Sequence, residues 1–470
     1  MDILIRFSEK GGFYSFRDVK EYLTKTVPEQ SYFFHLHKDL KRIEEGDKIY
    51  FSYKGQIVGR ARFTGKREER NNYYSFGYQI DDIKTFSPIK IDNKLFRGAP
   101  YFYINSSEKE EEIHRVDKII DQVKQKKHYV EKIQINNFTL FKDIELNFSK
   151  GLNIFIGANG TGKTHILKLI YSVIKANNSF KKRENTKKSY LARELFNELV
   201  DVFRVNKINN LISYDDIDNK ISTVYVECCG YKNKFEITEN TESEVSLDLF
   251  EKHPNIKNVI FIPAQEVLSH FKGFRPLWEE YYLPFDKTFY DLVKSLELPL
   301  IKEMSKEQKI INEELENIIE GEIININGEF YLKRYKDNKL IISSLMAEGL
   351  RKIGTISYLL KNGSLNSNSV LFWDEPEANL NPKLIKTIVK LLILLEKFGI
   401  QIFIATHSLF LIKELEILKS NIQTINYLNI VFSQKNNIQI TQSNIFDELE
   451  DLVLLDENLE QSDRFMEKVL

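Results

Sequence analysis

The chain has few cysteines, almost no net charge and no long apolar run. No stretch of eighteen consecutive apolar residues occurs among its 470 residues, so the sequence offers no membrane-spanning helix of ordinary length. The only two cysteines, Cys228 and Cys229, are adjacent. That spacing suits neither an ordinary structural disulfide nor a metal site, and we expect a reducing, cytoplasmic location. The formal net charge of −1 argues against a protein that is basic overall.

What is present is an ordinary globular composition, 42% hydrophobic and 29% charged, with one informative glycine-rich segment. Gly157-Ala-Asn-Gly-Thr-Gly-Lys-Thr164 matches the Walker A pattern G-x-x-x-x-G-K-[ST]. The apolar run Leu152–Ile156 before it predicts a buried strand, and the apolar spacing of residues 165–174 predicts a helix. A strand, a glycine turn and a helix N-terminus form an anion cradle. We expect ATP to be bound by Gly157, Asn159, Gly160, Thr161, Gly162, Lys163 and Thr164.

A second apolar segment, Ser369-Val-Leu-Phe-Trp-Asp-Glu375, ends in two carboxylates and has the Walker B pattern. Parallel strands of open α/β sheets collect ligands at their carboxyl ends, so Asp374 is expected beside the nucleotide. Together with the Thr164 hydroxyl, Asp374 would hold Mg²⁺ directly or through water. Glu375 is the predicted catalytic base that orients the attacking water, and Lys163 would reach the β- and γ-phosphates.

Two further apolar strands end in single polar residues. Asn258-Val-Ile-Phe-Ile-Pro-Ala-Gln265 precedes Walker B, and Gln401-Ile-Phe-Ile-Ala-Thr-His407 follows it. The loop Asn379–Pro382 lies between them. This order resembles the ATP-binding cassette (ABC) ATPases, in particular the RecF/SMC-like branch. The resemblance implies that Gln265 senses Mg²⁺ and water, that His407 contacts the γ-phosphate during catalysis, and that the loop after Walker B crosses a dimer interface.

The same resemblance calls for a signature motif, which each chain supplies to its partner's nucleotide. The candidate is Ser344-Leu-Met-Ala-Glu-Gly-Leu-Arg-Lys352, which departs from Leu-Ser-Gly-Gly-Gln. Ala347 stands where the family has a serine hydroxyl. Backbone N–H groups near Gly349 can still bind phosphate, and Arg351 would add positive charge. We therefore expect an ATP-dependent homodimer, or a higher homo-oligomer, with slow hydrolysis.

Three strings resemble a narrower group: Leu345–Ile353, Leu371–Pro382 and Ala405–Leu411. They look like the RecF-like ATPases of bacterial anti-phage systems, relatives of the ATPase part of the OLD (overcoming lysogenisation defect) proteins. The resemblance covers about residues 130–470. It implies a switch that senses a nucleic acid or phage signal and controls an effector, a nuclease or toxin, on another chain. The alternative is a RecF-like repair ATPase that acts directly on DNA; a transporter subunit is disfavoured.

The part before the ATPase domain reads as a small β-rich domain. A hairpin is predicted from Lys48–Tyr53 and Ile57–Phe63, with a further strand at Tyr73–Ile80 and one helix at Phe16–Thr24. The pattern resembles PUA-like barrels of the EVE and ASCH group, which implies possible DNA or RNA binding. The candidate stacking residues are Tyr32, Phe33, Phe34, Tyr73, Tyr74 and Phe76. The alternative, which we favour for any single one of them, is that these aromatics fill the core of a small barrel.

The expected fold class is therefore α/β: an ABC-type P-loop NTPase domain with a β lobe and a helical lobe, preceded by a barrel-like α+β domain. We place the PUA-like domain at residues 1–106, a charged connecting helix at 107–128, and the ATPase domain at 129–470. The insertion after Walker A, residues 176–257, should supply the β lobe, and the helical lobe should span about 266–345. The lobes are too short for a long coiled-coil arm.

Overall fold

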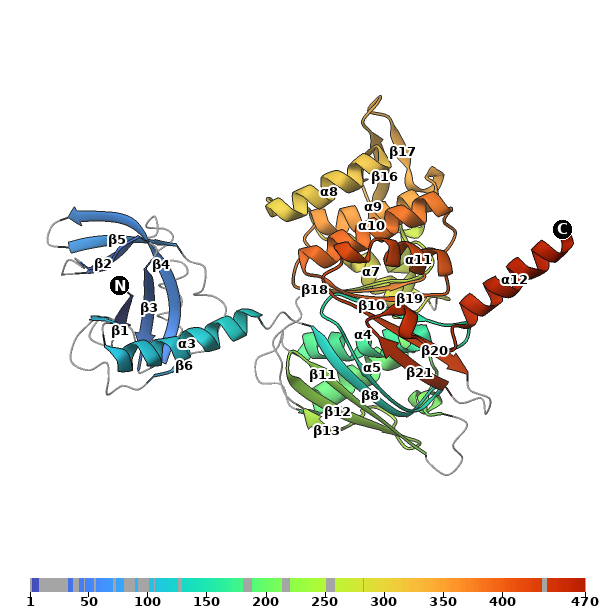
Figure 1. Ribbon diagram of the computed structural model, residues 1–470, viewed down its shortest axis with the longest axis horizontal. Helices are drawn as coiled ribbons and strands as arrows, with labels where there is room; N and C mark the ends of the chain where they lie inside the picture. Colours follow the sequence, from blue (N-terminus) through green and yellow to red (C-terminus); the bar gives the residue numbers. More distant parts are fainter. Residues whose placement is uncertain are drawn as a thin grey trace. The chain divides into compact units, whose positions relative to one another are not determined.

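The computed structural model describes residues 2–7, 33–36, 42–45, 47–54, 56–70, 73–79, 89–91, 101–104, 106–125, 129–180, 188–213, 220–250, 258–281, 283–432 and 438–469. The chain divides into two compact units, Met1–Lys127 and His128–Leu470 (Figure 1). Within the described ranges, no helix combines the length and the apolar character needed to cross a bilayer.

Unit 1 is built on a mixed sheet of seven strands in the order β2-β5-β4-β3-β1-β7, with β6 paired to β4. The predicted hairpin is present as β3 and β4, and the strand predicted at Tyr73 is β5. β1 pairs parallel with β3, while the other pairs are antiparallel. The strands are β1 (Ile3–Phe7), β2 (Phe33–Leu36), β3 (Lys48–Tyr53), β4 (Gln56–Arg70), β5 (Tyr73–Gln79), β6 (Ile89–Lys90) and β7 (Tyr101–Tyr103).

The predicted connecting helix is α3 (Ser107–Gln125), and its first half is part of the core of unit 1. Ile113 and Val116 of α3 are buried in a cluster with Leu4, Tyr50, Ile57, Ile91 and Ile104. These two apolar residues of the helix thus pack on unit 1, a contact that the sequence did not reveal. The helix predicted at Phe16–Thr24 lies outside the described residues, as do the side chains of the six candidate stacking aromatics.

Unit 2 has a central sheet in the order β14-β18-β19-β10-β20-β21, in which the first five strands run parallel. β21 is antiparallel to β20. The parallel strands are almost continuously apolar because both faces of the sheet are covered. The strands are β14 (Asn258–Ile262), β18 (Ser369–Asp374), β19 (Gln401–Thr406), β10 (Leu152–Ile156), β20 (Ile425–Phe432) and β21 (Ile438–Ser443).

The central sheet separates two hydrophobic cores. Helices lie on both sides of this sheet (Figure 1). Ile154 of β10 points into one core and the next residue, Phe155, into the other, as the alternation of a strand requires. The first core is shared with α7 (Lys287–Leu296), α8 (Lys306–Ile319), α9 (Glu348–Lys361), α10 (Pro382–Phe398) and α11 (Leu409–Ile417). The second core is shared with α4 (Lys163–Phe180), α5 (Lys188–Phe203) and the β lobe.

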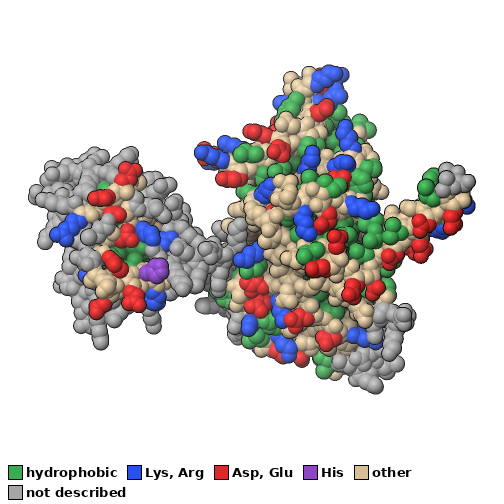
Figure 2. Space-filling view, in the orientation of Figure 1, with side chains coloured by type: hydrophobic (Ala, Val, Ile, Leu, Met, Phe, Trp, Pro, Cys, Tyr) green, Lys and Arg blue, Asp and Glu red, His purple; other side chains and the backbone are tan. Residues whose placement is uncertain are grey.

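The β lobe is an antiparallel sheet in the order β13-β12-β11-β8-β9. Its three later strands come from the insertion after Walker A, as predicted. The strands are β8 (Val130–Phe138), β9 (Phe141–Asn147), β11 (Ile221–Cys228), β12 (Tyr231–Thr238) and β13 (Ser246–Phe250). The chain's last described helix, α12 (Val453–Val469), carries a concentration of acidic side chains on its exposed surface (Figure 2).

The helical lobe predicted at 266–345 is not all helical. Besides α6 (Phe274–Glu280), α7 and α8, it contains a three-stranded antiparallel sheet, β15-β16-β17. Asn327 and Gly328 form the first turn, with φ angles of 52° and 78°. An Asn-Gly turn with two positive φ angles matches the twist of a two-residue hairpin. The prediction of a helical lobe was therefore wrong for this segment, which forms strands. The strands are β15 (Gly321–Ile326), β16 (Glu329–Arg334) and β17 (Leu340–Ile342).

Candidate nucleotide-binding site

The Walker A segment forms the turn between β10 and α4, and its backbone requires glycine. Gly160 and Gly162 have φ angles of 82° and 89°, which side-chain-bearing residues rarely adopt. A Cβ on Gly162 would also lie 2.6 Å from Cζ of Phe141, the first residue of β9. The β lobe therefore presses an aromatic ring onto the phosphate-binding turn, a contact that the sequence did not reveal.

Lys163 begins α4 and folds back over the turn. Its Nζ donates hydrogen bonds of 2.8 Å to the carbonyl oxygens of both Gly157 and Ala158. Burial lowers the pKa of Lys163, and the carboxylates of Glu375, Asp374 and Glu377 oppose this shift. The ammonium group is thus held over the loop where the Walker A geometry receives phosphate oxygens.

Thr164 and Asp374 meet at the carboxyl end of β18, as the two motifs predict. The Thr164 hydroxyl lies 3.0 Å from both carboxylate oxygens of Asp374. Burial raises the pKa of Asp374 to about 6, and the hydrogen bond from Thr164 opposes this shift. A hydroxyl and a carboxylate are hard oxygen donors that fit Mg²⁺, which takes its remaining ligands from phosphate and water in nucleotide sites. The described residues contain no group of three or more His, Cys, Asp or Glu able to hold a metal unaided.

Glu375 and His407 follow the neighbouring parallel strands β18 and β19, and their side chains meet. His407 Nδ1 lies 3.1 Å from Glu375 Oε1, and both side chains are partly exposed. Glu375 has a φ of 43°, a left-handed conformation, and its backbone N–H donates to the carbonyl oxygen of Ala405 at 2.9 Å. Glu375, the predicted base, and His407, which is expected to contact the γ-phosphate, therefore form one hydrogen-bonded pair that is partly exposed to solvent.

Glu377 is a member of the site that the sequence reasoning missed. It is buried, and its Oε1 accepts hydrogen bonds from the Thr406 hydroxyl and from the backbone N–H of His407. The Thr406 hydroxyl in turn accepts from the backbone N–H of Ser408 at 3.0 Å. This network fixes the backbone from which His407 projects. The only signal in the sequence was a further carboxylate two residues after Walker B.

Gln265 lies exposed in the loop after β14, the strand beside β18. Among the described contacts none joins Gln265 to Thr164 or Asp374, so its role toward Mg²⁺ stays a prediction. The next residue, Glu266, is buried and pairs with Arg351 of α9 at 2.9 Å.

The candidate signature segment forms the start of α9. Ala347 is its N-cap and provides no side-chain hydrogen bond, so the first N–H groups of the helix lack a side-chain cap. A Cβ on Gly349 would lie 2.7 Å from Cδ1 of Leu384, so this glycine permits the close approach of α9 and α10. Arg351 also donates to the carbonyl oxygens of Met346 and Ser343. Its charge is directed into its own chain, and a contact of Gly349 or Arg351 with a partner's nucleotide stays a prediction.

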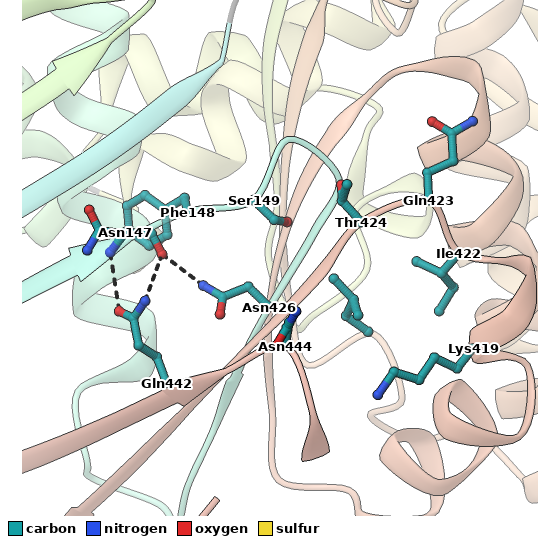
Figure 3. Close-up of a pocket in the computed structure, with 11 residues that line it drawn as sticks. Asn147, Phe148, Ser149, Lys419, Ile422, Gln423, Thr424, Asn426, Gln442 and Asn444 are labelled. Carbon is teal, nitrogen blue, oxygen red and sulfur yellow. Dashed lines mark hydrogen bonds between the residues drawn. The ribbon is translucent and has the colours of Figure 1, made fainter. Parts of the chain in front are cut away.

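A separate hollow of about 530 Å³ lies at the opposite, amino-terminal edge of the parallel strands β10 and β20 (Figure 3). The side-chain amide groups that line this hollow mainly form hydrogen bonds between the ends of neighbouring strands. Asn426 Nδ2 donates to the carbonyl oxygen of Asn147 at 2.8 Å, and the backbone N–H of Asn147 donates to Gln442 Oε1 at 3.2 Å. This hollow is not part of the nucleotide site.

Comparisons with known proteins agree with this geometry. The family described as "AAA domain, putative AbiEii toxin, Type IV TA system" matches residues 265–413, the stretch that holds Gln265, Asp374, Glu375 and His407. "DNA replication and repair protein RecF" of Cytophaga hutchinsonii is 51% identical over 43 residues, 9% of this chain and 11% of that protein. The protein of the same name from Clostridium kluyveri is 27% identical over 146 residues, 23% of this chain and 40% of that protein.

The chain thus matches only 11% and 40% of the length of these two relatives. Among solved structures, the SmcHead bound to the C-winged helix domain of ScpA is 14% identical, with a TM-score of 0.44 over 68% of this chain and 98% of that one. The strand–loop–helix geometry of Walker A and the parallel sheet define an ABC-type P-loop NTPase domain. With the family match, they support an ATP-binding ATPase domain.

Proposed function

We propose that this chain is an ATP-driven switch that pairs with a second copy across two bound nucleotides and hydrolyses ATP. The observation that carries the proposal is the convergence of three contacts at one edge of the central sheet. They are Lys163 over the Walker A turn, the Thr164–Asp374 pair, and the Glu375–His407 pair.

Each group has a distinct part in the proposed hydrolysis. Thr164 and Asp374 would hold Mg²⁺, which supplies positive charge to the phosphates when bound. Lys163 would stabilise the phosphate oxygens from the loop side. Glu375 would orient the attacking water and accept its proton, while His407, bonded to Glu375, would face the γ-phosphate. The left-handed backbone of Glu375 turns its carboxylate toward His407.

The partner chain would complete each site with the start of its α9. The exposed Ala347 leaves the first backbone N–H groups available to an anion, in keeping with phosphate binding at helix N-termini. Because alanine lacks the hydroxyl of the usual signature serine, the transition state loses one hydrogen bond and hydrolysis would be slow. The loop Asn379–Pro382 would cross between the two chains.

We further propose that the switch serves a bacterial anti-phage system in the cytoplasm. Unit 1 would sense a nucleic acid or a phage signal, and the ATP state would control an effector, a nuclease or toxin, on another chain. The description of the matched family names a putative toxin and a type IV TA system, which supports a connection of this domain with a toxin system. The exposed acidic helix α12 offers a surface for contact with such an effector.

The competing function is that of a RecF-like ATPase acting directly on DNA, and the matched stretches of proteins named "DNA replication and repair protein RecF" keep this alternative open. The two readings differ in what the purified chain does alone. Direct action on DNA predicts that duplex DNA raises the hydrolysis rate, with an effect that fades steeply between low and moderate salt. Effector control predicts little stimulation by DNA until a partner or a phage component is added.

The substitution Glu375→Gln tests the proposed switch itself. It removes the base and keeps the shape, so the variant should bind ATP and Mg²⁺ and remain a dimer, whereas the nucleotide-free chain should be a monomer. Light scattering during size-exclusion chromatography gives the masses. A monomeric variant at saturating ATP would rule out the shared site, and wild-type turnover in the variant would remove Glu375 from the role of base.

A further inference from the structure

Lys352 is a buried lysine on α9 whose ammonium group faces the Walker B turn of its own chain. Its side chain is only 1% exposed. Nζ donates to the carbonyl oxygen of Ala378 at 2.8 Å and lies 3.5 Å from that of Glu375. Glu348, one helical turn earlier, is 3.9 Å away. A buried ammonium is costly unless its donors are used, and here they are directed mainly at backbone oxygens of a single turn.

That turn holds Glu375 in an uncommon conformation. A non-glycine residue at a φ of 43° is strained and persists only when its surroundings hold it. The Ala378 N–H donates to the Glu375 carbonyl oxygen at 3.0 Å, which closes the turn. Lys352 binds the carbonyl oxygens at both ends of this closure, so its charge stabilises the turn in this form.

Two other contacts fasten the start of α9 to the same loop. Asn379 Nδ2 donates to Glu348 Oε1 at 3.2 Å. The missing side chain of Gly349 lets Leu380 and Leu384 approach the helix backbone. The first two turns of α9 and the loop after Walker B therefore pack as one piece, with Lys352 as its buried polar contact.

We infer that Lys352 is a positioning residue for the base: through the carbonyl oxygens of Glu375 and Ala378 it holds the left-handed turn that aims the Glu375 carboxylate at His407. The inference rests on the proposed hydrolysis of ATP. Without the ammonium group, the turn relaxes toward an ordinary conformation and the carboxylate moves away. Lys163 and Thr164 lie on other elements, so nucleotide binding is unaffected.

The test compares Lys352→Met with Lys361→Met in the full-length chain. Lys361 lies on the same helix and is also buried, but its contacts are Glu322, Glu316 and the carbonyl oxygen of Ile323, away from the Walker B turn. Steady-state hydrolysis gives kcat, and titration with a fluorescent ATP analogue gives Kd. Lys352→Met should lower kcat at least tenfold with Kd within twofold of wild type, while Lys361→Met keeps kcat within twofold.

Wild-type turnover in a folded Lys352→Met variant, or an equal loss in Lys361→Met, would overturn the inference. If the methionine variant does not fold, Lys352→Gln takes its place, with amide hydrogen exchange of residues 373–381 as the second measurement. Faster exchange in that segment, with unchanged exchange in the Walker A turn, is expected; unchanged exchange in both overturns the inference. Absence of Mg²⁺-dependent hydrolysis in the wild-type chain would instead refute the proposed function.

Discussion

The packing of Phe141 on Gly162 makes substitution of this glycine more destabilising than substitution of Gly160. The difference in unfolding free energy between the two variants can be measured. Both Gly160 and Gly162 have positive φ angles, so alanine at either position costs about 1–2 kcal/mol in backbone strain. At Gly160 a Cβ meets nothing within 4 Å, whereas at Gly162 it meets the Phe141 ring at 2.6 Å. Overpacking of this kind adds about 1–3 kcal/mol.

We therefore expect Gly160→Ala to lower the unfolding free energy of unit 2 by about 1–2 kcal/mol and Gly162→Ala by about 2–5 kcal/mol. The entropic effect of replacing glycine in the unfolded chain is the same for both variants and cancels in the comparison. Both tryptophans, Trp278 and Trp373, lie in unit 2, so their fluorescence during guanidinium titration reports the unfolding of this unit without nucleotide.

The double variant Gly162→Ala/Phe141→Leu identifies the cause of the extra loss. A smaller side chain at position 141 relieves the contact, so the two substitutions together should cost less than the sum of their separate effects. Equal destabilisation by Gly160→Ala and Gly162→Ala, or strict additivity in the double variant, would show that the β lobe does not press on the Walker A turn as described.

Two further predictions concern buried polar groups near the site. Glu377→Gln should lower kcat several-fold with little change in ATP affinity, because an amide oxygen is a weaker acceptor for the Thr406 hydroxyl and the His407 N–H; a larger loss of affinity than of kcat would contradict this. Burial lowers the pKa of His165 to about 4, so the unfolded chain binds more protons between pH 4 and 6.5. Stability should therefore fall as the pH drops through this window, by up to about 3 kcal/mol. His165→Gln should remove that part of the pH dependence, as measured by unfolding at pH 5 and 7.5; an identical slope in the variant would refute it.

The site elements that could be predicted from the sequence are those whose signals are local. Walker A, Walker B and Thr406-His407 each combine an apolar strand with a polar residue at its carboxyl end. Parallel strands bring such ends to one edge, so the meeting of Thr164 with Asp374 follows from the pattern alone. The hairpin at Asn327-Gly328 had an equally local signal, and overlooking it produced the all-helical reading of that lobe.

The remaining contacts depend on which elements pack together, and no local pattern contains them. Phe141 touches Gly162 because the β lobe folds over α4, and Lys352 reaches Ala378 because α9 lies beside the loop after Walker B. Arg351, expected to serve a partner's nucleotide, is paired with Glu266 of its own chain in the structure, and its contact with a partner's nucleotide stays a prediction. For long charged side chains, the sequence predicts the helix or strand on which the residue lies. It does not predict which neighbouring group the charged end contacts.

Two basic residues near the start of α9, Arg351 and Lys352, contact two different loops of unit 2. Arg351 pairs with Glu266, next to Gln265, and Lys352 binds the turn that carries Glu375. A helix fastened on both sides in this way cannot shift without moving either the Gln265 loop or the Walker B turn. In the proposed dimer, the partner's nucleotide would contact this helix at Ala347. Binding of a nucleotide in one proposed site would therefore change the position of Glu375 in the other site. This coupling would make hydrolysis in the two sites cooperative.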